Sequence, residues 1–151
     1  LEMDSGKMAL LRDTKVNSPT VECPYAKVTS LRNTVRNVIE TEFVEPQKVS
    51  ELLVIKDCHV LLVSGDKGGN IENGSNSMKF LFALIKTNNP QSRDSLTMYA
   101  AYQGPDISEN IAVFHGGYTH DLDLLQVENS PTGKKLLVCV QGDGEHQVCY
   151  I

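Results

Sequence analysis

Four short apolar runs, each followed by turn residues, constrain most strongly what this chain can fold into. The runs cover residues 59–64, 78–86, 96–102 and 134–140. Runs of this length between turns rich in Gly, Asn and Pro are typical of strands, and they fall far short of the ~18–20 residues that span a bilayer. The sequence therefore predicts four strands and no membrane-spanning segment.

The segment between the third and fourth runs has helical spacing instead. Ile107, Ile111 and Phe114 recur on one helical face. A Gly pair at 116–117 interrupts the pattern, and residues 118–127 resume it. Three strands joined by hairpins and then a helical crossover should return the fourth strand parallel to the first, through a right-handed connection. We therefore expect the α/β class or, more narrowly, an α+β fold with a mixed sheet.

Two short helices are expected before the first strand. Apolar side chains recur at helical spacing over residues 31–43, and Pro46 suits the first turn of a second helix over residues 46–55. Two such helices could form a helix-turn-helix that reads DNA. The second helix offers only Lys48 and Lys56 as cations, which favours a packing role.

Residues 1–28 show no sustained periodicity and contain Pro19 and Pro24. We expect a flexible N-terminal arm unless it docks on the core, followed by one domain over residues 29–151. The opening Leu-Glu ahead of Met3 indicates a vector-derived remnant or a cut from a longer protein.

Charge and cysteine content narrow the function classes. The 151 residues suit one domain, and 14 Lys+Arg against 19 Asp+Glu give a net charge of −5. This balance argues against a protein that holds DNA or RNA mainly by bulk charge, although a small local basic face stays open. Four cysteines without a secretory signal favour a reduced, intracellular setting.

A zinc site is the alternative use of the cysteines. Its ligands would be Cys139, His146 and Cys149, together with Cys58 or His59. The spacing C-x6-H-x2-C matches no common zinc motif, and the sequence has no CxxC pair. We therefore expect the cysteines to serve as small apolar residues.

Two acidic residues occupy matching places in the predicted sheet. Asp66 follows the first strand in SGDKGG, and Asp143 follows the fourth in QGDG. If these strands are parallel neighbours, both carboxylates leave the sheet at the same edge, where a divalent cation would offset their repulsion. Two-metal phosphoryl transfer uses such an arrangement. The competing interpretation is that Asp and Gly are ordinary turn residues here.

This succession of strands, with Asp on the first and the fourth, resembles the ribonuclease H-like fold of integrases, transposases and related nucleases. More narrowly, VSGDKGG at residues 63–69 followed by MKF at 78–80 resembles a GDKGG segment of transposon-encoded or transposon-derived animal proteins. The resemblance implies an RNase H-like β-β-β-α-β core preceded by two short helices. It also implies Asp66 and Asp143 as ligands of Mg²⁺ or Mn²⁺, and Glu109 on the crossover helix as a further catalytic carboxylate.

The same resemblance implies one more carboxylate on a helix beyond the fourth strand. The sequence ends eight residues after Asp143, so we expect a C-terminally incomplete core. The polar segment NIENGSNS at residues 70–77 further indicates an enlarged hairpin beside the expected site. Both departures favour a chain that is not an enzyme by itself.

Three functions are compatible with these features. The first is a transposase-derived module that acts as a non-enzymatic scaffold in the nucleus, with a protein partner and with nucleic acid bound through a local face. The alternative is a metal-dependent nuclease or strand-transfer core, present as a fragment, in which Asp66, Asp143 and Glu109 are catalytic. The third is a small-molecule or phosphate-binding domain that uses the GDKGG turn. No membrane association is expected, and an incomplete core could form a homodimer.

Overall fold

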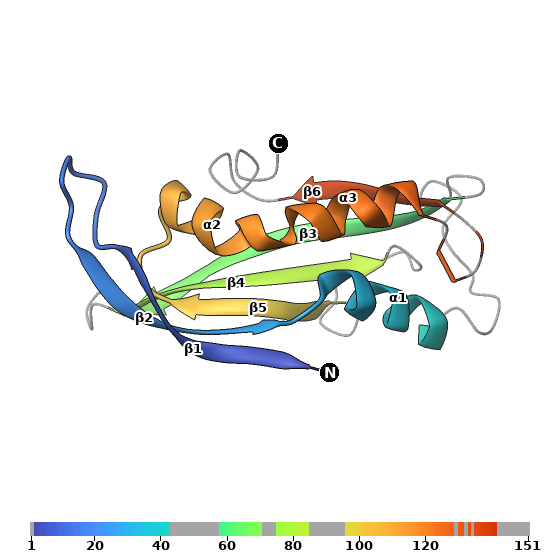
Figure 1. Cartoon of the computed structure of the whole chain (residues 1–151), viewed down its shortest axis with the longest axis horizontal. Coiled ribbons are helices and arrows are strands. Elements are labelled where there is room, and N and C mark those ends of the chain that lie inside the picture. Colours follow the sequence, from blue (N-terminus) through green and yellow to red (C-terminus); the bar gives the residue numbers. More distant parts are fainter. Residues whose placement is uncertain are drawn as a thin grey trace.

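The computed structural model describes residues 2–42, 58–70, 75–84, 96–128, 130–131, 133 and 135–141. These residues form a six-stranded mixed sheet with helices along one side, in the strand order β1-β2-β5-β4-β3-β6 (Figure 1). The strands are β1 (Met3–Leu11), β2 (Thr20–Val28), β3 (Cys58–Asn70), β4 (Ser75–Leu84), β5 (Thr97–Gln103) and β6 (Lys135–Gln141). The predicted α+β class with a mixed sheet is confirmed.

The N-terminal segment is a hairpin of the sheet, which differs from the flexible arm that the sequence predicts. β1 and β2 pair antiparallel along their whole length, from Met3 opposite Val28 to Leu11 opposite Thr20. β2 then pairs with β5 over residues 25–27. The hairpin is held on the rest of the sheet because Leu10, Cys23 and Val28 are buried in the core.

The four predicted strands are present, and their pairing follows the predicted scheme. β3, β4 and β5 are antiparallel neighbours, and β6 lies parallel to β3 from Cys58 opposite Lys135 to Ser64 opposite Gln141. The return of the fourth strand parallel to the first is therefore confirmed. β3, however, continues through the glycines to Asn70. β3 is this long because it stays paired with β4 as far as Asn70 opposite Ser75. Asp66 therefore lies inside β3 and not in a turn after it.

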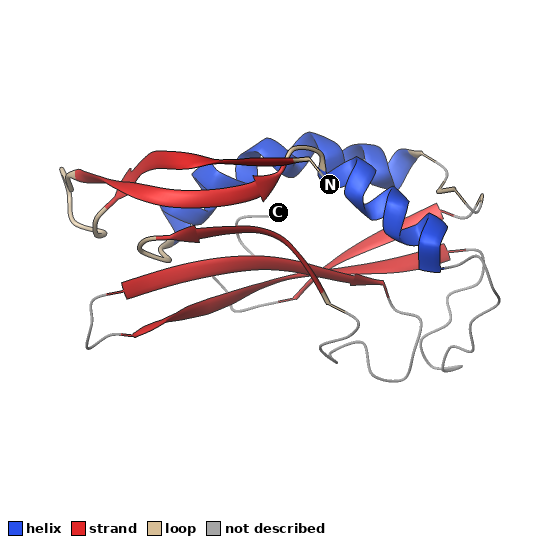
Figure 2. Ribbon diagram, turned by 90° about the horizontal axis from the view of Figure 1, so that it is seen from below, coloured by secondary structure: helices blue, strands red, loops and turns tan. Residues whose placement is uncertain are grey.

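The helices lie along one side of β3, β4 and β5 (Figure 2). They are α1 (Leu31–Glu42), α2 (Ser108–His115), the 3₁₀ turn η4 (Gly116–Tyr118) and α3 (Thr119–Val127). The predicted first helix and the interrupted crossover helix are confirmed, whereas the predicted helix over residues 46–55 lies outside the described residues. Among the described residues, no helix is long and apolar enough to cross a membrane.

An aromatic cluster joins the sheet to the crossover helices. Phe80 of β4 stacks on Phe114 of α2 with ring centroids 5.4 Å apart, and Tyr99 of β5 meets Tyr118 edge-on at 5.5 Å. All four side chains are at most 4% exposed. Such ring pairs add about 0.5–1.5 kcal/mol each beyond the burial of apolar area, so this cluster fixes the helices on the sheet.

Side chains alternate between two faces of the sheet. In β3, Leu61 and Val63 are buried toward the helices, and their partners in β4, Leu84 and Phe82, belong to the same core. The intervening residues point to the opposite side, which we call the distal face. The distal face includes Ser64, Asp66, Ser77, Lys79, Ala101 and Gln103.

Candidate functional site

Asp66 lies on the distal face and not on the helix side. Its neighbour Gly65 pairs with Phe80, whose ring stacks on α2. Since consecutive residues of a strand face opposite sides, Asp66 points away from α2. Its cross-strand partner is Lys79, and both side chains are exposed. Opposite charges directly across an antiparallel pair attract weakly at an exposed position.

Glu109 lies in the first turn of α2 and is exposed. A carboxylate there is favourable because the N-terminal end of a helix carries partial positive charge. α2 covers the side of the sheet opposite Asp66, so the structure does not bring Glu109 and Asp66 together. Asp143 lies outside the described residues.

The three arginines in the described part of the chain each lie beside an acidic side chain. The guanidinium group of Arg32 binds Glu128 through Nε and Nη2, with Nε 3.0 Å from Oε2, and Arg36 lies 3.9 Å from the same oxygen. These contacts lower the pKa of Glu128, chiefly through the hydrogen bond from Arg32. Arg12 pairs with Asp13 at 3.2 Å. The described residues therefore provide no basic helix face of the kind that nucleic-acid-binding helices use.

The zinc hypothesis gains no support from the residues that can be placed. His146 and Cys149 lie outside the described residues, while Cys139 is a free, partly buried thiol in β6. Within the described part of the chain, no group of three or more His, Cys, Asp or Glu side chains is positioned to hold a metal ion. Cys23 is also free, and burial, with a smaller contribution from Glu22, raises the pKa of its thiol. A thiol with a raised pKa is a poor nucleophile at neutral pH.

Two buried tyrosine hydroxyls lie between the sheet and the helices. The hydroxyl of Tyr99 is 2.6 Å from Nε2 of His115, and both residues are at most 2% exposed. The hydroxyl of Tyr118 donates to the carbonyl of Val28 at 2.6 Å, and burial raises its pKa well above the ordinary range. These hydrogen bonds satisfy polar groups inside the core, which is a structural role.

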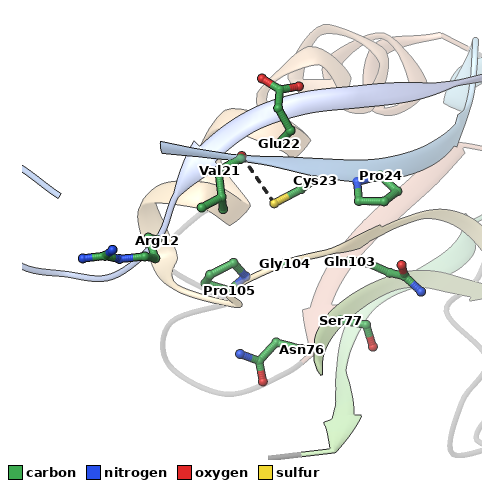
Figure 3. A pocket seen from close by; sticks show the side chains of 10 residues that line it. All are labelled: Arg12, Val21, Glu22, Cys23, Pro24, Asn76, Ser77, Gln103, Gly104 and Pro105. Atoms are coloured by element: carbon green, nitrogen blue, oxygen red, sulfur yellow. Dashed lines mark hydrogen bonds between the residues drawn. The ribbon is translucent and has the colours of Figure 1, made fainter. Parts of the chain in front are cut away.

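The sheet opens where β5 ends. β4 and β5 remain paired only as far as Ser77 opposite Gln103, and Gly104 then crosses beneath Cys23. An open cavity of about 550 Å³ lies there between β2, β4 and the end of β5 (Figure 3). Its lining mixes one guanidinium, one carboxylate, two amides and a hydroxyl with apolar side chains such as Val21 and Pro105. Nothing in this lining selects one ligand chemistry.

A buried asparagine that the sequence does not mark as a site residue ties α2 to the end of β1. Asn110 of α2 is 1% exposed, and its carboxamide binds the end of β1. Oδ1 accepts from the N–H of Leu11 at 2.8 Å, and Nδ2 donates to the carbonyl of Leu11 at 2.8 Å. Nδ2 also donates to the carbonyl of Pro105 at 3.0 Å. The sequence contains no signal for this role, because an Asn early in a helix ordinarily faces solvent.

Comparison with known proteins gives no match to the chain, either among protein-family models or among curated protein sequences.

Proposed function

We propose that the chain is a non-catalytic interaction module, built on an RNase H-like and transposase-derived core, whose main partner is a protein. The strand succession supports the core. β3, β4 and β5 are antiparallel neighbours, α2 and α3 follow, and β6 returns parallel to β3. This is the β-β-β-α-β order that the resemblance implies.

The opposite placement of Asp66 and Glu109 carries the non-catalytic part of the proposal. Carboxylates that share a two-metal site must converge, because the two ions lie only ~3.5–4 Å apart. Asp66 faces the distal side beside Lys79, and Glu109 begins the helix that covers the other side. These two residues do not fit a common Mg²⁺ or Mn²⁺ site. A cation beside Asp66 would also meet the ammonium group of an adjacent lysine.

A metal-dependent nuclease or strand-transfer core is the second candidate, and one observation favours it. Ser64 and Gln141 are the last parallel partners of β3 and β6. Asp66 and Asp143 each follow two residues later in the sequence. Equal offsets after a parallel pair suit two carboxylates that share a cation. This candidate uses Asp66 and Asp143 but not Glu109.

A divalent-cation titration separates the two candidates. Mg²⁺ and then Mn²⁺ are added to the chain and thermal unfolding is recorded for the parent, for Asp66→Asn and Asp143→Asn, and for Glu109→Gln as a matched carboxylate control. A cation bound at a hundredfold excess over its Kd stabilises the folded state by about 2.7 kcal/mol. We expect no rise in Tm that depends on Asp66. Stabilisation of the parent that both Asp variants lose, and that Glu109→Gln keeps, would establish the nuclease-type site instead.

The partner and the location of the module belong to the same proposal. A protein partner suits the net charge of −5 and the engagement of Arg12, Arg32 and Arg36 by acidic neighbours. Nucleic acid would then be contacted through a local face, in the nucleus. The salt dependence of binding to duplex DNA tests this point, because each phosphate contact steepens it.

A further inference from the structure

The backbone hydrogen bonds at both ends of the N-terminal hairpin show which residues of β1 bond to β2 and which face outward. The N–H of Thr29 donates to the carbonyl of Glu2 at 3.0 Å, and the N–H of Arg12 donates to the carbonyl of Pro19 at 3.0 Å. Both bonds flank one uninterrupted register. In an antiparallel pair, residues alternate between hydrogen-bonded and non-hydrogen-bonded positions. Even-numbered residues of β1 therefore bond to β2.

The odd-numbered residues of β1 direct their backbone groups away from β2. They are Met3, Ser5, Lys7, Ala9 and Leu11. Pro24 lies opposite Lys7, at a position where β2 needs no N–H for this pairing, which agrees with the assignment. β1 is an edge strand in the described sheet, so the outer backbone groups of Met3, Ser5, Lys7 and Ala9 have no strand partner among the described residues.

Leu11 shows what kind of group this edge accepts. Its N–H and carbonyl are both bound by the carboxamide of Asn110, at 2.8 Å each. A carboxamide has the donor and acceptor of a peptide group, so Asn110 occupies the place that the next strand would take. The outward backbone groups of Leu11 are thus already bound. From Ala9 back to Met3, the odd-numbered residues point the same kind of N–H and carbonyl groups outward.

We propose that the outer edge of β1 binds an extended peptide segment of a partner protein by strand addition. This inference rests on the proposed function, since it gives the interaction module its binding site and its class of partner. Main-chain hydrogen bonds supply affinity in this mode, and alternate side chains supply specificity. A second copy of the chain suits the edge less well, because a stable dimer buries ~1,200–2,000 Å² and one strand edge provides only part of that area.

The side chains of β1 define the chemistry of the peptide. Lys7 is exposed and makes no ion pair among the described residues, so a carboxylate directly opposite it is favoured. Met8 points to the other side and is partly buried against the core, which favours a β-branched residue opposite it. An edge lysine also discourages indiscriminate strand pairing, so the peptide must supply the acid.

A blocked synthetic peptide of alternating valine and threonine, with one central glutamate, is the probe. Its binding is measured by fluorescence anisotropy, and amide hydrogen exchange of β1 is followed by NMR. We expect protection to rise at Ser5, Lys7 and Ala9 and to stay unchanged at Gly6 and Met8, whose amides already bond to β2. Protection that rises equally at both sets, or in another element, would overturn the proposal.

Two variants of one residue separate the backbone from the side chain. Lys7→Pro removes the charge and also an outward N–H that β2 does not use, so the fold should persist and peptide affinity should fall about tenfold below that of Lys7→Met, as expected for one hydrogen bond. Lys7→Met keeps the N–H and removes the charge, and we expect only a few-fold loss. An unchanged affinity in Lys7→Pro, with an unchanged Tm, would refute the strand-addition site.

The two proposals fail in different ways. Suppose that the peptide protects the odd-numbered residues and that Mg²⁺ also raises the Tm through Asp66. The edge site would then stand, and the proposal of a non-catalytic function would fail. No peptide binding in a chain that gains nothing from Mg²⁺ would overturn the edge site alone. Odd-residue protection that appears without peptide and grows with protein concentration would assign the edge to a second copy, against the proposal.

Discussion

At the level of single residues, Glu128 joins α1 to the end of α3. It follows α3 and receives the guanidinium groups of Arg32 and Arg36 from α1. The N–H of Arg32 also donates to Oδ2 of Asp121 in the first turn of α3, at 3.2 Å. α1 and α3 therefore adhere through a charged cluster at their ends, in addition to the buried face of α1.

Acidification should weaken this cluster. Arg32, and then Arg36, lower the pKa of Glu128 in the folded chain below the ordinary glutamate value of about 4.3. A lowered folded-state pKa contributes stability above the unfolded pKa, and that contribution is lost as pH falls through the folded pKa. Glu128→Gln should lower Tm slightly at neutral pH. The difference in Tm between this variant and the parent should vanish once the pH is below the folded-state pKa of Glu128. The exposed Glu40→Gln on α1 is the control, and an equal pH dependence in both variants would contradict this role.

At the scale of elements, one close approach decides how β5 leaves the sheet. A Cβ on Gly104 would lie 2.6 Å from Sγ of Cys23 and 3.6 Å from Cδ1 of Leu10. Gly104→Ala should therefore destabilise the fold by about 1–3 kcal/mol, the usual cost of overpacking. Adding Cys23→Ala to this variant should recover part of the loss, because the sulfur is removed. Urea unfolding measures both.

Gly116 provides the matched control for this substitution. It begins η4 with φ −56°, and a Cβ built on it would meet no packed neighbour within 4 Å beyond its adjoining backbone. Gly116→Ala should stabilise the chain by about 0.4–1 kcal/mol by restricting the unfolded state. Equal effects of alanine at both glycines would show that the contact with Cys23 does not limit the fold.

Periodicity predicts the elements whose residues carry their own signal. The apolar runs give β3 to β6, and the helical spacing gives α1 and the crossover, including its break at Gly116. β1 and β2 have no such signal, because β1 is mostly exposed and β2 contains Pro24. What holds them is distant in sequence, since Leu11 and Asn110 are 99 residues apart. The GDKGG segment reads as a turn, although pairing with β4 keeps it in β3.

The candidate site is harder to predict because two carboxylates on a strand and on a helix packed against it can face opposite sides of the sheet. The sequence places Glu109 on the crossover helix, and the structure agrees, but it places Asp66 after the first predicted strand, whereas the structure has Asp66 inside β3. Which side Asp66 faces depends on the register of β3, which pairs Gly65 with Phe80. A shift of one residue would turn Asp66 toward α2. Periodicity within one strand does not determine that register.

At the scale of the whole molecule, the hairpin of β1 and β2 completes the core and is not an appendage. Leu10 and Val28 are each 2% exposed, and full burial of such aliphatic side chains contributes roughly 1.5–3 kcal/mol each. The hairpin also satisfies two buried groups on the crossover helices, the carboxamide of Asn110 and the hydroxyl of Tyr118. Leaving a buried polar group unpaired costs about 1–3 kcal/mol.

A chain that begins at Thr29 tests this view against the expectation of a flexible arm. The losses above together approach the net stability of a typical domain, about 5–15 kcal/mol. The shortened chain should therefore unfold or lose cooperative melting, with exchange protection falling in α2 and β5 as well. A control that lacks only Leu1 and Glu2 removes one hydrogen bond, from Thr29 to Glu2, and should melt close to the parent. A cooperative transition at the parental Tm in the shortened chain would show that residues 29–151 fold alone, and that the hairpin only rests on a core already complete.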